Sequence, residues 1–336
     1  MVQKTILLVV LVALLIPHSC DDQIQEIHVS PAGDDAASGT LSNPVKSLQQ
    51  AAWLARDHTG QVPTTIYLSG GSYFLSEALV LGPEDGGSKS APVTWTSLPG
   101  EHAIISGGME VEGWKEEKDG SWSADFPAGY QGTFRSFYVN GRRATRARYP
   151  NDTYLRIKEA GKDNRTHFQY HEQDMPKLEH TEGMELILLH DWSVTRIPVK
   201  SIDRGSQLLT AVDSIGARLD FFTLTHWEKH PRYYLENLRE FFDREGEWYA
   251  DFGQRKIYYH PRAEDRIGET TGIIPVAGQL LRIEGNEEER AAHIGFSGIT
   301  FEHSSWTIPG KGYCGIQACM HTDRSRPENS WSQVPA

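Results

Sequence analysis

The chain has 336 residues, with 33 Lys and Arg against 45 Asp and Glu, which gives a formal net charge of −12. This length suits one large domain or two ordinary ones, and a hydrophobic content of 38% argues against wholesale disorder. The acidic balance argues against a general binder of nucleic acid or of anionic membranes, because phosphate surfaces select for basic patches.

The first twenty residues have the layout of a signal peptide. An apolar run of 11 residues, from Ile6 to Ile16, follows Lys4 and precedes Pro17. A spanning helix needs about 20 apolar residues, so this run is too short to cross a bilayer. We expect residues 1–20 to be removed, no transmembrane segment in the mature chain, and a secreted, periplasmic or cell-surface location. Lipidation of Cys20 stays open as an alternative to plain secretion.

Residues 21–108 read as short strands separated by Gly, Pro and Ser. The strands centred on Ile66 and Thr94 look equivalent and lie 28 residues apart, a period that favours a solenoid of stacked coils. A β-sandwich would fit the strand lengths nearly as well. Residues 47–56 predict an amphipathic helix, capped by Ser47, that covers the open end of the first coil.

The pattern changes between residues 109 and 271, where loops lengthen and hairpin signals appear. Turns are predicted at Asp119-Gly120, Asn140-Gly141 and Phe252-Gly253-Gln254. These hairpins predict an antiparallel β insertion domain. Residues 272–336 return to short Gly-bounded strands and predict a resumed, incomplete coil region. The expected fold class is therefore all-β.

Three stretches of the chain carry a resemblance to a known family. IHVSPAGDDAASGTLSNPVKSLQQA resembles the entrance of right-handed parallel β-helix, pectin-lyase-like proteins. VNGRRATRARYPN, and YYLEN with the later KIYYHP and FSGITFEHSSW, resemble glycoside hydrolase family 141 and its insertion domain. The resemblance implies α-L-fucosidase or endo-xylanase activity on plant polysaccharides. It also places the catalytic acidic residues in coils beyond Ala336, so we expect this chain to be the front part of a longer protein and to lack its catalytic carboxylates.

The leading functional hypothesis is a glycoside hydrolase acting on plant-type or fucosylated polysaccharide. A polysaccharide lyase and a non-catalytic glycan-binding or adhesive protein are the alternatives. Sequence motifs for phosphate loops, dinucleotides, zinc proteases and serine hydrolases are missing. We expect no cofactor. Ca²⁺ stays open as an alternative, although it needs several converging oxygen ligands and no loop sequence shows them. The expected partner is a glycan, and the oligomeric state is left open.

Sugar hydrolysis needs paired carboxylates, but no pair can be chosen from the sequence. The acidic candidates are scattered, and the catalytic residues are therefore left unassigned: Glu84, Asp85, Asp191, Glu228, Glu236, Asp243, Glu245 and Glu302.

Substrate contacts are predicted from arginines and aromatic residues. Arg146 and Arg148 share one face of a predicted strand and could clamp sugar hydroxyls or a uronate; ion pairing within the acidic insertion domain is the alternative. Aromatic rings pack on sugar faces, and loops often carry ligand contacts. The candidate substrate-binding residues are Arg146, Arg148, Tyr149, Trp227, Tyr234, Asn237 and Trp306.

The remaining cysteines are Cys314 and Cys319, spaced C-x4-C. Outside the cytosol they could form a disulfide, and two buried thiols are the alternative. No metal site is expected, because a zinc site needs more Cys or His ligands and only His321 lies close in sequence.

Overall fold

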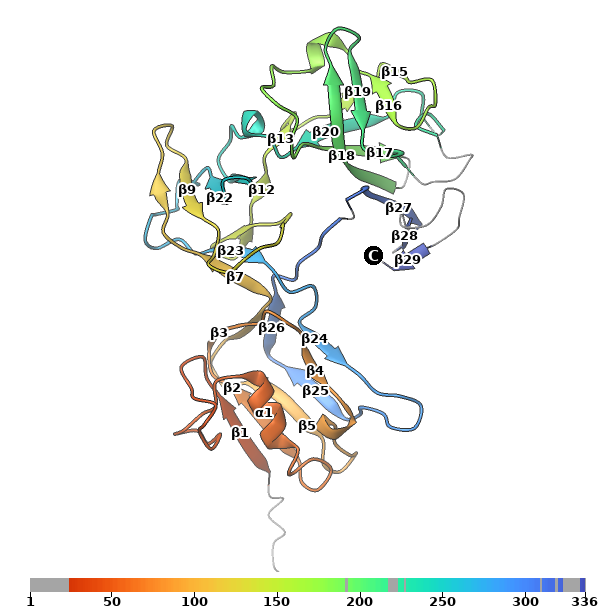
Figure 1. The fold of residues 1–336 in the computed structure, drawn as a ribbon. Helices are drawn as coiled ribbons and strands as arrows, with labels where there is room; N and C mark the ends of the chain where they lie inside the picture. The colour runs from red at the N-terminus through yellow and green to blue at the C-terminus, as the bar shows by residue number, and fades with distance from the viewer. Residues whose placement is uncertain are drawn as a thin grey trace, which may run out of the picture. The chain divides into compact units, whose positions relative to one another are not determined.

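A computed structural model describes residues 24–190, 193–216, 223–226, 228–308, 310–317, 320–322 and 333–335 (Figure 1). The expected signal peptide, Cys20, Trp227 and Cys319 lie outside the described residues. Within them, no helix is both long and apolar enough to cross a membrane. The chain divides into two compact units, which are described separately. The first comprises the residues up to Tyr73, Leu79–Ile104 and Leu281–Thr300, and the second comprises Phe74–Ala78, Ile105–Leu280 and the residues from Phe301 onward.

The first unit is built on a parallel sheet, as the solenoid prediction requires. Its strands, in spatial order, are β1 (Gln25–Val29), β2 (Thr64–Leu68), β5 (Val93–Ser97) and β25 (Ile294–Ser297). A second parallel pair joins β4 (Leu79–Leu81) to β24 (Leu281–Ile283). Strands β5 and β25 are neighbours in space, although the main segment of the second unit separates them in sequence. The parallel coils are therefore interrupted and then resumed.

One apolar ladder runs across this sheet. Ile27 pairs with Ile66, Ile66 with Trp95, and Trp95 with Phe296. The Trp95 and Phe296 rings stack with their centres 5.9 Å apart. The predicted equivalence was off by one residue, because Ile66 pairs with Trp95 rather than with Thr94. The register follows the large apolar side chain, since its burial stabilises the coil interior.

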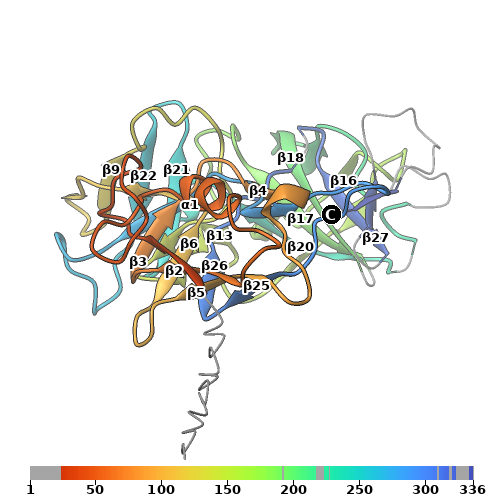
Figure 2. The ribbon, with the colours of Figure 1, turned by 90° about the horizontal axis from the view of Figure 1, so that it is seen from below.

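The predicted capping helix is α1 (Leu48–Ala55). The Ser47 hydroxyl accepts a hydrogen bond from the Gln50 N–H at 3.1 Å, which satisfies one of the unpaired donors at the helix start. Leu48, Ala51, Ala52 and Ala55 are buried. The helix packs against β1, β2, β4 and the 3-10 turn η1 (Pro83–Asp85) (Figures 1 and 2).

The main segment of the second unit has one strand pair near its two ends. Strand β7 (Gly108–Val111) runs antiparallel to β23 (Gly272–Pro275), with Val111 opposite Gly272. These strands lie in a sheet of order β11-β10-β23-β7 with β10 (Tyr138–Val139) and β11 (Arg142–Arg143). A further three-stranded sheet has the order β26-β6-β3, with β3 (Gly71–Phe74), β6 (Ala103–Ser106) and β26 (Ile299–Glu302).

All three predicted hairpins are confirmed. Strands β8 (Lys115–Glu116) and β9 (Trp122–Asp125) flank Asp119-Gly120, and β21 (Glu247–Asp251) and β22 (Lys256–Tyr259) flank Phe252-Gly253-Gln254. Strands β10 and β11 flank Asn140-Gly141, where both residues have positive φ, 51° and 72°, as a two-residue hairpin turn of this sequence demands. The sheet of order β12-β21-β22-β9-β8 contains one parallel pair, β12 (Thr145–Arg146) with β21.

The largest sheet follows the path β13-β20-β17-β18-β19-β16-β15. The strands on this path are β13 (Arg148–Tyr149), β20 (Arg232–Glu236), β17 (Glu185–His190), β18 (Ser193–Asp203), β19 (Leu208–Ala211), β16 (His167–Gln169) and β15 (Glu159–Ala160). Strand β14 (Leu155–Arg156) adds to β20, and the 3-10 turns η2 (Glu172–Asp174) and η3 (Arg239–Phe241) lie in its connections.

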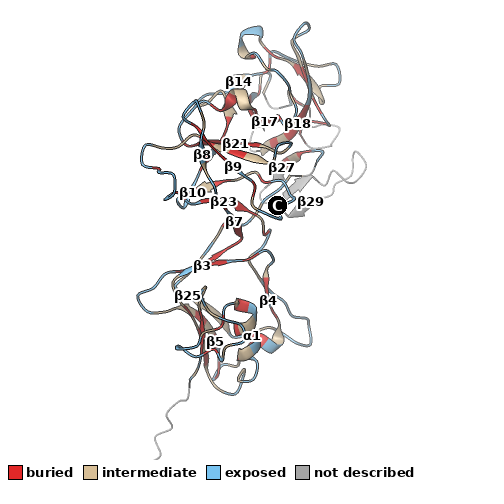
Figure 3. Ribbon diagram, turned by 60° about the vertical axis from the view of Figure 1, so that its left-hand side comes forward, coloured by how far each residue is buried: buried red, intermediate tan, exposed pale blue. Residues whose placement is uncertain are grey.

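Among the described residues of this unit, buried side chains form two apolar clusters, and Figure 3 colours the buried residues red. One lies on the largest sheet and includes Phe168, Leu186 and Tyr233. The other is aromatic and includes Phe134, Trp248 and Tyr259. Trp248 is fully buried, so its ring belongs to this core.

The segment after β26 departs from the expected coil. Strand β27 (Tyr313–Gln317) pairs antiparallel with β18, and β28 (Met320–Thr322) and β29 (Gln333–Pro335) follow it antiparallel. Gly312 has φ of 91°, and a Cβ there would lie 2.7 Å from Ile197 Cγ1, so glycine permits the close approach of β27 to β18. Residues 313–317 thus extend the second unit's sheet, because the open edge of β18 offers them backbone partners.

Candidate functional site

A cavity of about 540 Å³ lies in the second unit and is lined mainly by arginines and aromatic rings. Its lining residues are Arg135, Arg143, Ala144, Arg146, Val194, Arg196, Glu236, Trp306 and Tyr313. They come from the segment before β10, from β11 to β12, from β18 and β20, from the chain after β26 and from β27. Residues distant in sequence therefore meet at one site.

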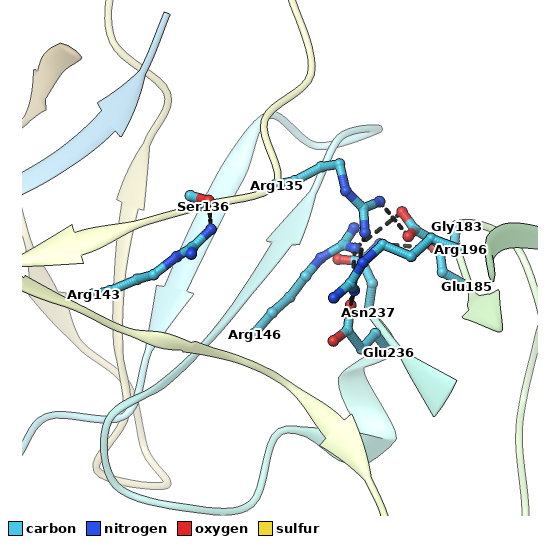
Figure 4. Close-up of polar contacts among 9 residues, drawn as sticks. All are labelled: Arg135, Ser136, Arg143, Arg146, Gly183, Glu185, Arg196, Glu236 and Asn237. Atoms are coloured by element: carbon cyan, nitrogen blue, oxygen red, sulfur yellow. Dashed lines mark hydrogen bonds and ion pairs between the residues drawn. The ribbon is translucent and has the colours of Figure 1, made fainter. Parts of the chain in front are cut away.

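Glu236 lines the cavity, and a second carboxylate, that of Glu185, belongs to the residue opposite it. Glu185 on β17 and Glu236 on β20 stand directly opposite each other in an antiparallel register (Figure 4). Like charges in such cross-strand positions repel. Arginines offset this repulsion: Arg146 Nη1 lies 2.9 Å from Glu185 Oε1 and 3.5 Å from Glu236 Oε2, and Arg135 is hydrogen-bonded to Glu185. The arrangement is an ion-pair network rather than two isolated bridges.

One oxygen of Glu236 is shared by three guanidinium groups. Its Oε2 lies 3.8 Å from Arg135 Nη2, 3.5 Å from Arg146 Nη1 and 3.6 Å from Arg196 Nη1. Charge-assisted hydrogen bonds are normally about 2.7–2.9 Å long, so these contacts are ion pairs at longer range. The shared carboxylate of Glu236 therefore leaves donors of these guanidinium groups without a short hydrogen bond to it.

Burial makes this network electrostatically strong. The side chains of Arg135 and Arg146 are 9% and 8% exposed, whereas that of Arg196 is 28% exposed. Burial alone would raise the pKa of Glu185, but Arg146 and Arg135 outweigh it and lower the pKa. Burial lowers the pKa of Arg135, and the Glu185 charge opposes that effect. Glu185 is thus held as a carboxylate.

Two nitrogen atoms of the buried arginines, Nε of Arg135 and Nε of Arg146, have no hydrogen-bond partner in the described part of the chain. Three guanidinium groups carry about fifteen N–H donors, whereas two carboxylates offer about eight acceptor positions. The site therefore has more hydrogen-bond donors than its two carboxylates can accept.

An aromatic wall completes the cavity. Trp306 is 42% exposed, and its ring meets that of Tyr313 edge-on at 5.3 Å. The Arg135 guanidinium lies 5.7 Å from the centre of the Trp306 ring. An apolar ring beside hydrogen-bond donors suits a ligand with one apolar face and several polar groups.

The predicted binding residues separate into two groups. Arg146 and Trp306 both line the cavity. Arg148 and Tyr234 instead contact each other, with the guanidinium 3.9 Å from the ring centre. Burial raises the pKa of Tyr234 and Glu236 adds to this, while Arg196 and Arg148 oppose it. The Arg148–Tyr234 contact thus adjoins the cavity without lining it.

Tyr149 and Asn237 have structural contacts. Tyr149 stacks on Phe241 at 5.7 Å. Asn237 has φ of 66° and donates a hydrogen bond from Nδ2 to the Gly183 carbonyl at 2.8 Å. Both side chains fix the connection that follows β20.

The site also contains residues that the sequence did not single out as ligand contacts. Arg135 and Arg143 were visible in an arginine-rich stretch, but Glu185 and Arg196 were missed. A signal for Glu185 exists in hindsight, because it is a lone charge at the start of the apolar strand ELILLH. A charge in such a position needs a partner.

Several of the acidic candidates that the structure describes already have partners, and Asp191 lies outside the described residues. Asp85 is bound by Arg56 at 2.8 Å in the first unit, Glu228 pairs with Arg156, and Glu302 lies 3.6 Å from His303. Asp243 accepts a hydrogen bond from Asn151 at 2.7 Å. In the described residues, no group of three or more His, Cys, Asp or Glu is placed to hold a metal ion. Cys314 is buried on β27, and its proposed disulfide partner lies outside the described residues.

Comparisons with known proteins agree with the fold. Residues 120–262 match the GH141 insertion domain. A solved structure described as a glycoside hydrolase is similar to this chain with a TM-score of 0.77 and 28% identity, covering 88% of this chain and 54% of that one. Pectate lyase PEL9 of Emericella nidulans is 35% identical over 96 residues, which are 29% of this chain and 22% of that protein. The chain thus spans about half of the first relative and about a fifth of the second.

These similarities define a pectin-lyase-like, all-β protein related to glycoside hydrolases. More narrowly, the fold is GH141-like and carries the GH141 insertion domain.

Proposed function

We propose that this chain belongs to an extracellular glycoside hydrolase that acts on plant-type or fucosylated polysaccharide, and that the arginine-lined cavity binds the glycan. One observation carries the proposal: guanidinium donors and the half-exposed ring of Trp306 converge on one cavity, and most of its lining lies in the stretch that matches the GH141 insertion domain. Sugars offer both hydroxyl acceptors and an apolar ring face, so this combination suits them.

The cavity has a binding role rather than a role in bond cleavage. Glycoside hydrolysis needs one carboxyl group that is protonated and donates to the leaving oxygen. Arg146 and Arg135 lower the pKa of Glu185 against the effect of burial, so Glu185 is a poor proton donor. We therefore assign the opposed carboxylates to holding the arginines in place.

A polysaccharide lyase is the second candidate, and the similarity to pectate lyase PEL9 favours it. A lyase breaks the chain by elimination and leaves an unsaturated sugar, whereas a hydrolase adds water and leaves a saturated reducing end.

Incubation of the whole protein with xylan, fucosylated oligosaccharides and polygalacturonate distinguishes these functions. New reducing ends without ultraviolet absorbance from unsaturated products support the hydrolase. Unsaturated products that need added Ca²⁺ support the lyase. Glycan binding with no turnover on any substrate contradicts both enzymes and leaves a non-catalytic, glycan-binding protein.

We also propose that the protein is exported, with its mature chain starting near Asp21 or at Cys20. The support is the basic start and short apolar run of residues 1–20. Mass spectrometry of the mature N-terminus tests this, since an intact Met1 in a cytosolic fraction contradicts export and a lipid adduct on Cys20 identifies a lipoprotein.

A further inference from the structure

We propose that the cavity selects an acidic sugar, namely a hexuronate unit within a glycan, and that its carboxylate is bound by the guanidinium groups of Arg196, Arg146 and Arg135. This inference rests on the proposed glycan-binding function and adds the chemical class of the unit that is bound.

The charge of the lining is the first argument. Four arginines line the cavity against a single carboxylate, that of Glu236. Glu185 lies beside them and removes one more positive charge. The site remains cationic after both carboxylates are counted, in a chain whose formal net charge is −12. A neutral sugar needs hydroxyl partners but no such excess of positive charge, whereas an anionic ligand is stabilised by it.

The unused donors are the second argument. Nε of Arg135 and Nε of Arg146 are buried without a hydrogen-bond partner in the described residues. Buried donors of a charged group are costly to leave unpaired, and both side chains are more than nine-tenths buried. A ligand carboxylate supplies planar acceptor oxygens that match the guanidinium fork. Arg196 is the most exposed of the three ion-paired arginines and is the one a ligand reaches first.

The aromatic wall separates a sugar acid from a simple anion. Trp306 presents a half-exposed ring beside Arg135, and Tyr313 lies against it. A pyranose ring can pack its C–H face on such a wall while its carboxylate points toward the arginines. The volume of about 540 Å³ falls within the range of ligand pockets, about 300–1,000 Å³. Acetate or phosphate would leave the aromatic wall unused.

The test is titration calorimetry of the chain with tri-galacturonate. Its fully methyl-esterified form, neutral galactotriose and sodium acetate are the comparison ligands. We expect tri-galacturonate to bind at least about tenfold more tightly than the ester, because the ester loses the charge-assisted hydrogen bonds. A higher salt concentration should weaken the binding of tri-galacturonate and leave the binding of neutral galactotriose nearly unchanged.

Two variants divide the site into its parts. Arg196→Gln should lower the affinity for tri-galacturonate by about tenfold and remove most of the preference for the acid over the ester. Trp306→Ala should lower the affinity for tri-galacturonate and for its methyl ester to a similar extent, because the aromatic wall packs on the sugar ring of both ligands. The matched control is Arg142→Gln, since Arg142 is exposed, pairs with Glu264 and does not line the cavity. Circular dichroism of each variant confirms that it is folded.

The outcomes separate this inference from the proposed function. Equal affinity for the acid, the ester and galactotriose overturns uronate selection and leaves glycan binding standing. Acetate binding as tightly as tri-galacturonate also overturns it, because the sugar ring then contributes nothing. No binding of any uronate, together with hydrolysis of neutral polysaccharide by the whole protein, overturns the inference while supporting the hydrolase.

Discussion

The guanidinium group of Arg148 lies 3.9 Å from the centre of the Tyr234 ring. The same side chain donates hydrogen bonds from Nε to the Pro150 carbonyl at 3.1 Å and from Nη2 to the Thr153 carbonyl at 3.2 Å. Arg148 thus joins the loop after β13 to the face of β20. A residue predicted to clamp a sugar is already engaged by its own chain.

Arg148→Lys should therefore reduce stability more than it reduces glycan affinity. Lysine keeps the charge but loses the fork that reaches two carbonyls, and we expect a cost of about 1 kcal/mol in the free energy of unfolding. Urea denaturation measures it. Unchanged stability with a large loss of glycan affinity would instead show that Arg148 contacts the ligand directly.

Arg146→Met should be strongly destabilising. The substitution leaves Glu185 and Glu236 opposed on neighbouring strands with less compensation, and breaking such a buried pair costs about 3–5 kcal/mol. Adding Glu185→Gln to the same chain should restore part of the loss, because it removes the charge left without its partner. Arg142→Gln, on an exposed pair with Glu264, should change stability by less than about 0.5 kcal/mol. Similar losses in both single variants would contradict the buried network.

Glu247→Gln should stabilise the protein above neutral pH. Glu247 is 3% exposed and accepts hydrogen bonds from the Asp243 and Arg244 N–H groups at 3.1 and 3.2 Å. Burial raises its pKa to about 7, with the Asp243 charge adding to the effect and the backbone hydrogen bonds opposing it. The folded state therefore holds this proton more tightly than the unfolded state, and stability falls as the pH rises from about 4.5 to 7. Glutamine cannot ionise, so we expect a gain of about 1–3 kcal/mol at pH 8 and little at pH 4. An equal effect at both pH values would exclude ionisation as the cause.

His190→Gln should flatten the loss of stability in acid. His190 is 4% exposed, and its Nε2 lies 3.0 Å from Thr195 Oγ1. Burial lowers its pKa to about 4, so the unfolded state takes up a proton first as the pH falls below about 6.5. The stability that the neutral ring contributes is lost as the pH falls from 6.5 to 4, whereas the contribution of Glu247 to stability rises over the same range.

The Glu247→Gln variant should accordingly lose stability more steeply than the parent as the pH falls, as measured by thermal unfolding. An identical dependence of stability on pH in both chains would contradict these opposing contributions.

Local signals predicted much of the fold. The Asn140-Gly141 turn, the cap at Ser47 and the apolar face of α1 depend on residues close in sequence. The pairing of β27 with β18 could not be anticipated, because a strand's partner is set by which open edge is available in three dimensions. The cavity was harder still. Arg146 and Trp306 were selected for their chemistry alone, and the sequence did not indicate that they line one cavity. The opposition of Glu185 and Glu236 arises from the register of two strands that are distant in the chain.

The pairing of β7 with β23 has a consequence for how this protein can vary. Val111 and Gly272 face each other across that pair, so a tight turn between them would close a simple hairpin. The chain between residues 112 and 271 leaves and returns at this strand pair, so its length does not change the register of β7 and β23. Residues can therefore be added to or removed from this stretch without changing the pairing of β7 with β23.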